Sequence, residues 1–238
     1  MARWSYGQKG ARPRQRRAPE PLPAPLPPET RTVGQLIAEA IRIYGKDFWR
    51  VVPLGIPVAL LEWLAYGGRT SDRQTIFLWL LTPLFAAAYV WAVVIVSGTE
   101  LDRQSALVAY VVAIAVFLPF PLLVRILVLP GIFYLALVGL AVPAALLERL
   151  EFRDAFRRGF ELGRADVVHS LGGLAALTLV FGVGAYALAY LLHGQGGQAV
   201  RGAATLGDLV LSPVVFLGSA LLYYDQKARL ERRAAATS

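Results

Sequence analysis

A run of 43 residues from Ser105 to Leu147 contains a single charged side chain, that of Arg125. A helix needs about 20 apolar residues to cross a bilayer, so this run is long enough for two crossings joined by a turn near residues 125–129. Membrane β-strands would instead alternate polar and apolar residues over about 10 positions, and this run does not alternate. The run therefore predicts two transmembrane helices, because a helix satisfies its own backbone hydrogen bonds in lipid.

Apolar stretches of similar length lie on both sides of this run. Of the 238 residues, 56% are hydrophobic and only 17% are charged, whereas about 25% of a typical soluble domain is charged. Too few polar side chains remain to cover a surface in water. The expected fold class is therefore all-α, a polytopic membrane helix bundle within a membrane domain of residues 31–226. Six transmembrane helices are predicted, at residues 48–67, 75–97, 105–125, 129–147, 169–192 and 204–224.

An amphipathic helix is predicted over residues 32–46, directly before the first span. Apolar side chains such as Leu36 and Ala40 recur there at intervals of three and four residues, which is the period of one helix face. Thr32 followed by Gln35 matches a capping box at the start of the helix. We expect this helix to lie along the membrane interface.

A second amphipathic interfacial helix is predicted over residues 152–166, between the fourth and fifth spans. Phenylalanines recur every four residues on one face, and arginines cover much of the rest. Arginine at a membrane surface attracts acidic lipid headgroups, so the expected partner of this helix is the lipid bilayer. The phenylalanines are Phe152, Phe156 and Phe160, and the expected headgroup contacts are Arg153, Arg157 and Arg158.

The two ends of the chain differ in composition from the membrane domain. Residues 1–30 combine six basic side chains with a proline-rich stretch and show no apolar period. This segment is predicted to be a disordered tail, with a proline-rich ligand for a partner protein as the alternative. No apolar stretch follows the basic residues, so the segment does not resemble a secretory signal. Residues 227–238 are predicted to form a second basic tail.

The distribution of basic residues predicts the orientation of the six spans. With six crossings, both termini share one side of the membrane. That side then carries 20 of the 24 Lys and Arg residues, and the opposite side carries four, at positions 69, 73, 125 and 201. Segments rich in Lys and Arg stay in the cytoplasm, so both termini are expected in the cytoplasm of a bacterial inner membrane. The positive charge is thus interpreted as an orientation signal rather than as a nucleic-acid surface.

Two polar residues are candidates for an intramembrane site. Glu62 is the one acid well inside a predicted span, and a charge in hydrocarbon is costly unless it is paired or hydrated. Arg125 lies at a compatible height, so a Glu62–Arg125 pair is the preferred interpretation. The alternatives are a Glu62 solvated at the interface and an ion or substrate site. Asp208 and Asp225, near the two ends of the sixth span, are interpreted as interfacial charges.

The remaining residue types offer little for chemistry. Cysteine is absent, which excludes disulfides, thiol nucleophiles and cysteine metal sites. The two histidines, His169 and His193, lie at opposite ends of the fifth span and cannot share a metal ion within one chain. No catalytic motif occurs in the spans. No catalytic residue, metal site or cofactor is therefore predicted.

Three segments resemble a bacterial membrane-protein family. They are AEAIRIYGKDFWRVVPLGI (38–56), LPGIFYLALVGLAVPAALLERLEFRDAFRRGFELGR (129–164) and LLYYDQKARLE (221–231). These resemble the membrane domain that accompanies some glycerophosphodiester phosphodiesterases and its stand-alone relatives. The resemblance implies six spans with cytoplasmic termini and carries no catalytic residues, because the family's chemistry belongs to a separate soluble domain that we do not expect here. Gly159 departs from the family, which often has serine there.

Two main functions follow from these features. The first is a non-enzymatic integral membrane protein of the bacterial inner membrane, acting as a scaffold or in envelope or lipid homeostasis. The second is a small-molecule or lipid transporter or permease subunit, favoured by the intramembrane polar residues and by prolines within the spans. An intramembrane enzyme is disfavoured, since acid–base clusters are missing from the sequence.

Overall fold

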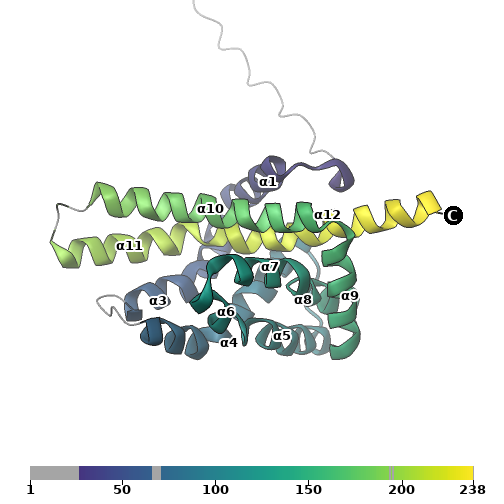
Figure 1. Cartoon of the computed structure of the whole chain (residues 1–238), viewed down its shortest axis with the longest axis horizontal. Coiled ribbons are helices and arrows are strands. Elements are labelled where there is room, and N and C mark those ends of the chain that lie inside the picture. The colour runs from purple at the N-terminus through teal and green to yellow at the C-terminus, as the bar shows by residue number, and fades with distance from the viewer. Residues whose placement is uncertain (1–26, 66–70, 193, 195, 238) are drawn as a thin grey trace, which may run out of the picture.

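The computed structural model describes residues 27–65, 71–192, 194 and 196–237, and their regular structure is entirely helical (Figure 1). The predicted all-α fold class is confirmed. Within these residues, six helical segments are long and apolar enough to cross a membrane, as the hydropathy pattern predicts. Most of the predicted amino-terminal tail, residues 1–26, lies outside the described part of the chain.

The six spans are mostly composite helices. The first contains α2 (Phe48–Val51), η2 (Val52–Gly55) and α3 (Ile56–Ala65), and the second is α4 (Ser71–Ser97). The third contains α5 (Arg103–Phe117) and α6 (Phe120–Ile126), and the fourth α7 (Val128–Val138) and α8 (Ala141–Leu147). The fifth is α10 (Val167–Leu191), and the sixth contains α11 (Gly197–Leu211) and α12 (Pro213–Thr237). Three further helices lie outside the spans: η1 (Pro28–Thr30), α1 (Val33–Lys46) and α9 (Phe152–Ala165).

Proline explains most of the breaks within the spans, because it lacks a backbone donor and clashes with the preceding turn. Pro53 lies in η2, Pro119 is the N-cap of α6, and Pro213 begins α12. Pro83 is accommodated inside α4. Leu127 is extended (φ −160°, ψ 149°) and forms the turn between α6 and α7, within the turn region expected from the sequence.

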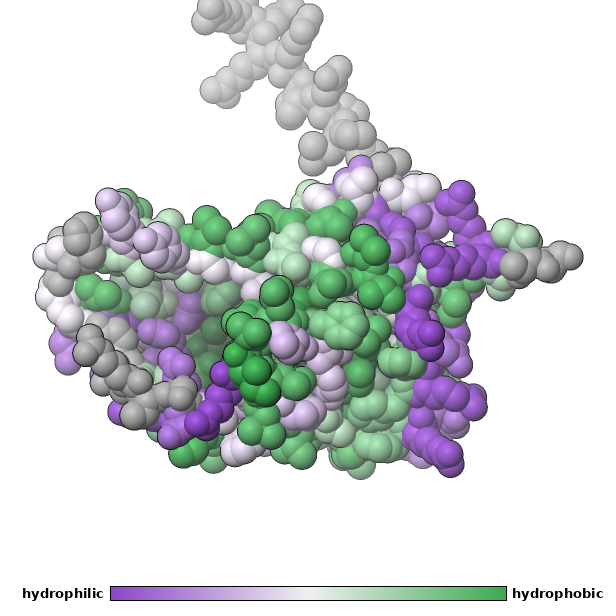
Figure 2. Space-filling model, viewed as in Figure 1, coloured by the Kyte–Doolittle hydropathy of each residue, from purple (hydrophilic) through white to green (hydrophobic). Residues whose placement is uncertain are grey.

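The bundle has two unlike ends (Figure 1). At one end, α9 runs across the spans, and both η1 and the last turns of α12 lie there; we call this the α9 end. At the other end, α10 turns back into α11; we call this the hairpin end. Figure 2 shows hydrophilic residues gathered at the α9 end and hydrophobic residues over the middle of the molecule. This banding is the pattern expected of a protein that spans a bilayer.

The packing face of α9 combines small residues with Leu162, which is fully buried. Gly159 and Gly163 are buried against α8 and α7, and a Cβ added at Gly159 would lie 2.4 Å from the backbone nitrogen of Ala141. Phe152 and Phe160 are nearly half exposed. The helix therefore approaches α7 and α8 closely through its glycines and leaves Phe152 and Phe160 outward, which suits contact with lipid, while Phe156 packs partly against the core.

Helix α1 packs on α12 and α10 through the stripe expected from the sequence. Leu36 and Ala40 are fully buried there. The predicted capping box is confirmed: the Thr32 N–H donates to Gln35 Oε1 at 2.7 Å, and the Gln35 N–H donates to Thr32 Oγ1 at 3.4 Å. The apolar stripe of α1 thus contacts the bundle, and the location of this helix at the membrane interface stays a prediction.

Candidate functional site

A buried polar network joins three parts of the chain at the α9 end. Asp225 of α12 is completely buried, which corrects its interpretation as an interfacial charge. Its Oδ1 accepts a hydrogen bond from Arg31 Nη1 at 2.8 Å, and its Oδ2 lies 3.2 Å from His169 Nε2 of α10. The Asp225 carboxylate therefore holds the segment before α1 against α10 and α12.

The contacts of His169 define its tautomer. Arg229 Nη2 lies 3.3 Å from His169 Nδ1, and a guanidinium can only donate. Nδ1 must therefore accept, and Nε2 carries the proton that is donated to Asp225. The imidazole is neutral in this arrangement, so two arginines, Arg31 and Arg229, balance two aspartates, Asp225 and Asp166.

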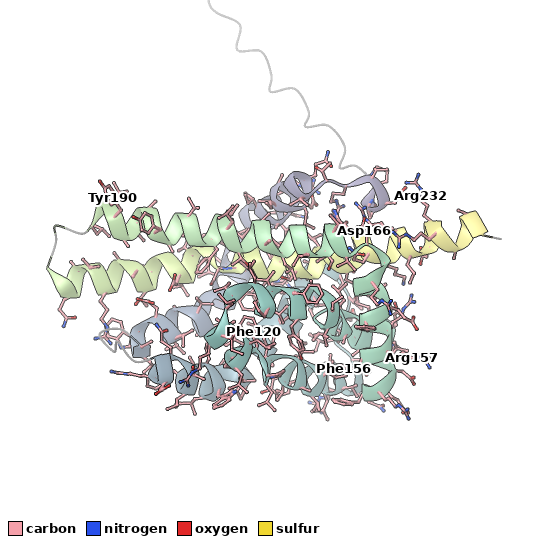
Figure 3. The ribbon with its side chains drawn as sticks, in the orientation of Figure 1. Phe120, Phe156, Arg157, Asp166, Tyr190 and Arg232 are labelled. Atoms are coloured by element: carbon pink, nitrogen blue, oxygen red, sulfur yellow. The ribbon has the colours of Figure 1, made fainter. Side chains whose placement is uncertain are left out.

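Asp166 links α9 and α10 to the last span. Its carboxylate caps α10 by accepting the His169 N–H at 3.0 Å, and it pairs with Arg229 Nη1 at 2.7 Å. Burial alone would raise the pKa of the Asp166 carboxyl, but the hydrogen bond from His169 and the charge of Arg229 lower this pKa below its usual value. Gln226 exchanges two hydrogen bonds of 3.0 Å with the Asp166 backbone. Figure 3 shows Asp166 at the α9–α10 junction.

A second cluster surrounds Glu148, at the end of α8. Tyr223 donates its hydroxyl proton to Glu148 Oε1 at 2.7 Å, and Arg158 Nε donates to Glu148 Oε2 at 3.0 Å. Arg158 thus bonds inward, which corrects its expected role as a headgroup contact. Arg157 and Arg153 are exposed, and Figure 3 shows Arg157 pointing away from the bundle.

We call these two clusters the clamp, because they join α8, α9, α10, α12 and the segment before α1. The carboxylates of Asp225, Asp166 and Glu148 each have a cation beside them, whereas the buried Nε of Arg229 has no hydrogen-bond partner among the described residues. A buried pair loses several kcal/mol when one partner is removed, because the other charge is left uncompensated. The clamp therefore fixes the α9 end of the bundle and positions the helices that surround the cavity described next.

An apolar cleft of about 320 Å³ lies among the spans. Residues of α3, α4, α5, α6, α7, α10 and α12 line it, and the surface is hollowed between the α10–α11 pair and the helices α3 and α4 (Figure 2). This volume lies in the range of small-molecule sites. Six aromatic side chains contribute to the wall: Phe85, Tyr89, Phe117, Phe120, Phe181 and Phe216.

The few polar groups in the wall of this cleft are already bonded to the backbone. Ser212 Oγ donates to the carbonyl of Asp208 at 2.6 Å, and Ser219 Oγ donates to that of Val215 at 2.7 Å. The Tyr89 hydroxyl donates to the Ser219 carbonyl at 3.5 Å. The wall therefore has few hydrogen-bonding groups left for water. An apolar ligand fits this cleft better than a polar one.

The structure separates the two polar residues that were expected to pair. Arg125 Nη2 lies 2.6 Å from Asp72 Oδ1, at the start of α4, and no contact between Glu62 and Arg125 occurs among the described residues. Asp72 lies just before the second span as predicted from the sequence, at residues 75–97. Glu62 lies on α3, which packs against α11, the helix that carries Asp208. Asp208 is only 8% exposed, which corrects its interpretation as an interfacial charge.

Comparison of the chain with protein-family models, with curated proteins and with solved structures finds no match. His193 lies outside the described residues, and groups of three or more residues able to hold a metal ion are absent from the described part of the chain.

Proposed function

We propose that this chain is a non-enzymatic, multi-pass protein of the bacterial cytoplasmic membrane that binds membrane lipid and acts in lipid homeostasis. The observation that carries this proposal is the apolar cleft, which lies among helices long enough to span a bilayer. In that setting the apolar molecule present at high concentration is the lipid acyl chain. A chain in the cleft restores the dispersion contacts that an empty cavity lacks.

The α9 end supports the proposed orientation. The basic segments favour a cytoplasmic location for this end and for both termini. Arg153 and Arg157 are exposed on α9, where they can meet acidic headgroups, although Arg157 also pairs with Asp154 at 3.6 Å; Arg158 is held by Glu148. The clamp gives the bundle a fixed framework at this end. We further propose that the chain is a stand-alone relative of the membrane domain of glycerophosphodiester phosphodiesterases.

Photocrosslinking tests whether acyl chains enter the cleft. The purified chain is reconstituted in vesicles containing a phospholipid with a diazirine at mid-chain, and the labelled peptides are mapped by mass spectrometry. Tyr89 is 4% exposed and lines the cleft, so lipid at the outer surface of the bundle has little access to it. We expect label on the peptide that carries Tyr89.

Two tryptophan variants, one inside the cleft and one outside it, show whether labelling of Tyr89 requires an open cleft. Val215→Trp adds bulk to the cleft wall, whereas Val183→Trp places the same side chain at an exposed position of α10. Val215→Trp is expected to abolish label at Tyr89, and Val183→Trp is expected to leave it unchanged. Equal labelling of Tyr89 in both variants, or an unlabelled Tyr89 in the wild-type protein, contradicts the proposed function.

A further inference from the structure

The side chains that line the apolar cleft differ in burial between its two ends. Toward the α9 end the wall consists of buried residues, which we call the floor of the cleft: Tyr89, Leu140, Leu174, Phe216 and Leu222. Toward the hairpin end it consists of partly exposed residues on α3, α4, α6 and α10, which we call the mouth: Leu61, Leu78, Val124 and Phe181. The cleft is therefore closed toward the α9 end and open toward the hairpin end.

The packing at the α9 end explains why the floor is closed. Every residue of α8 from Ala141 to Leu146 is buried, and the buried residues of α10 lie between His169 and Leu177. Tyr223 follows the floor residue Leu222 directly and belongs to the clamp through its hydrogen bond to Glu148. An acyl chain could thus enter from this end only by displacing the clamp, whose buried pairs are costly to break.

The hairpin end offers an apolar route into the cleft. The surface there is hollowed between the α10–α11 pair and the helices α3 and α4 (Figure 2). The helices that contribute mouth residues also carry exposed apolar side chains, such as Leu179 and Val183 on α10 and Ile126 on α6. In a bilayer these surfaces lie against acyl chains, so a chain can pass from the lipid into the cleft without crossing a polar surface.

The length of the cleft matches the depth of one leaflet. Leu78 of the mouth and Tyr89 of the floor are about 16 Å apart along α4, at 1.5 Å per residue. The hydrocarbon core of a bilayer is about 30 Å thick, so each leaflet contributes roughly half of this distance. An acyl chain whose headgroup stays at the membrane surface can therefore reach the floor.

We propose that the cleft takes its acyl chain from a phospholipid of the leaflet at the hairpin end, with the methyl end of the chain at the floor. This inference rests on the proposed function and adds the direction of the chain and the leaflet that supplies the lipid. The headgroup stays at the mouth, because the hydroxyls of Ser212, Ser219 and Tyr89 in the wall already bond backbone carbonyls. With both termini in the cytoplasm, as proposed above, this leaflet is the outer one.

The test maps the direction of the chain along α4. The full chain is reconstituted in vesicles with a phospholipid whose diazirine lies next to the ester, at mid-chain or near the methyl end, and label is assigned to single residues by fragmentation in the mass spectrometer. As the diazirine moves toward the methyl end, label should shift from Leu78 to Tyr89. Both reporters belong to one molecule, so the result does not depend on which way the protein inserts into the vesicle.

Variants at the mouth test the route of entry. Leu61→Trp narrows the mouth on α3, whereas Leu60→Trp places the same bulk on the neighbouring residue, which is 37% exposed and lies outside the cleft wall. With the methyl-end diazirine, Leu61→Trp should lose label at Tyr89, and Leu60→Trp should retain it. Should Leu61→Trp fail to fold, the diazirine series in the wild-type protein remains decisive.

The outcomes separate this inference from the proposed function. A shift of label in the opposite direction, or equal ratios of label at Leu78 and Tyr89 for all three diazirine positions, overturns the proposed direction and leaves chain binding intact. Undiminished label at Tyr89 in a folded Leu61→Trp variant overturns entry through the mouth. If no diazirine position labels Tyr89 in the wild-type protein, the proposed function fails as well.

Discussion

Replacing Asp225 with alanine is expected to lower the free energy of unfolding by about 3–5 kcal/mol, the usual cost of breaking a buried ion pair. The variant leaves the Arg31 guanidinium, whose side chain is 10% exposed, without its carboxylate. It also removes the acceptor for His169 Nε2. Unfolding in mixed detergent micelles, followed by tryptophan fluorescence, measures the change.

An exposed ion pair provides the matched control for Asp225. Asp72 pairs with Arg125 at 2.6 Å, but the two side chains are 64% and 46% exposed. Asp72→Ala should therefore cost less than about 1 kcal/mol. Replacing both Arg31 with methionine and Asp225 with leucine should recover much of the lost stability, since no buried charge then remains unpaired. Equal losses in Asp225→Ala and Asp72→Ala would show that the clamp does not stabilise the bundle.

Replacing Gly159 with alanine is also expected to lower the free energy of unfolding. An alanine Cβ there would meet the Ala141 backbone nitrogen at 2.4 Å and its Cα at 2.5 Å, and backbone atoms cannot move aside as a side chain can. Helix α9 must therefore shift away from α8. Overpacking of this kind costs about 1–3 kcal/mol, so Gly159→Ala should unfold at a correspondingly lower detergent or denaturant concentration.

Gly45 is the control position for Gly159. Alanine at Gly45 changes the backbone preference without creating a close contact. Gly45 lies in the last turn of α1, and an added Cβ there meets nothing within 4 Å. Gly45→Ala should stabilise the protein by about 0.5–1 kcal/mol, because alanine favours the helix more than glycine does. A stabilising effect of alanine at both positions would refute the close approach of α9 to α8.

The spans were predictable because each is encoded locally. A membrane helix needs a continuous apolar stretch, and that requirement is visible without knowledge of any partner. The capping box of Thr32 and Gln35 and the turn at Leu127 are equally local, since their signals lie within a few residues. These features therefore followed from hydropathy and from short spacings in the sequence.

The polar contacts were not predictable because they join distant parts of the chain. Arg31 and Asp225 are 194 residues apart, and no helical period relates them. Hydropathy shows where an apolar stretch ends, but it does not show whether the charge at that end is exposed or paired. For this reason Asp225 and Asp208 were both assigned to the interface, and Arg125 was assigned to Glu62 instead of Asp72.

The packing face of α9 was missed for a related reason. Glycine contributes little to a hydropathy pattern, so the phenylalanines dominated the interpretation of this helix. Close approach of two backbones depends on the absence of a side chain, as at Gly159 and Gly163. Only the position of α8 and α7 shows that these glycines form the contact.

We propose that the six helices cross the cytoplasmic membrane with the α9 end inside, and single-cysteine labelling in cells is the direct test of this topology. The chain contains no cysteine, so each introduced thiol is unique. Arg153 is exposed on α9, and Gln198 is exposed at the hairpin end. A membrane-impermeant maleimide should label Gln198→Cys in intact cells and Arg153→Cys only after permeabilisation. Labelling of Arg153→Cys in intact cells, or recovery of the chain as a detergent-free cytosolic protein, would contradict the claim.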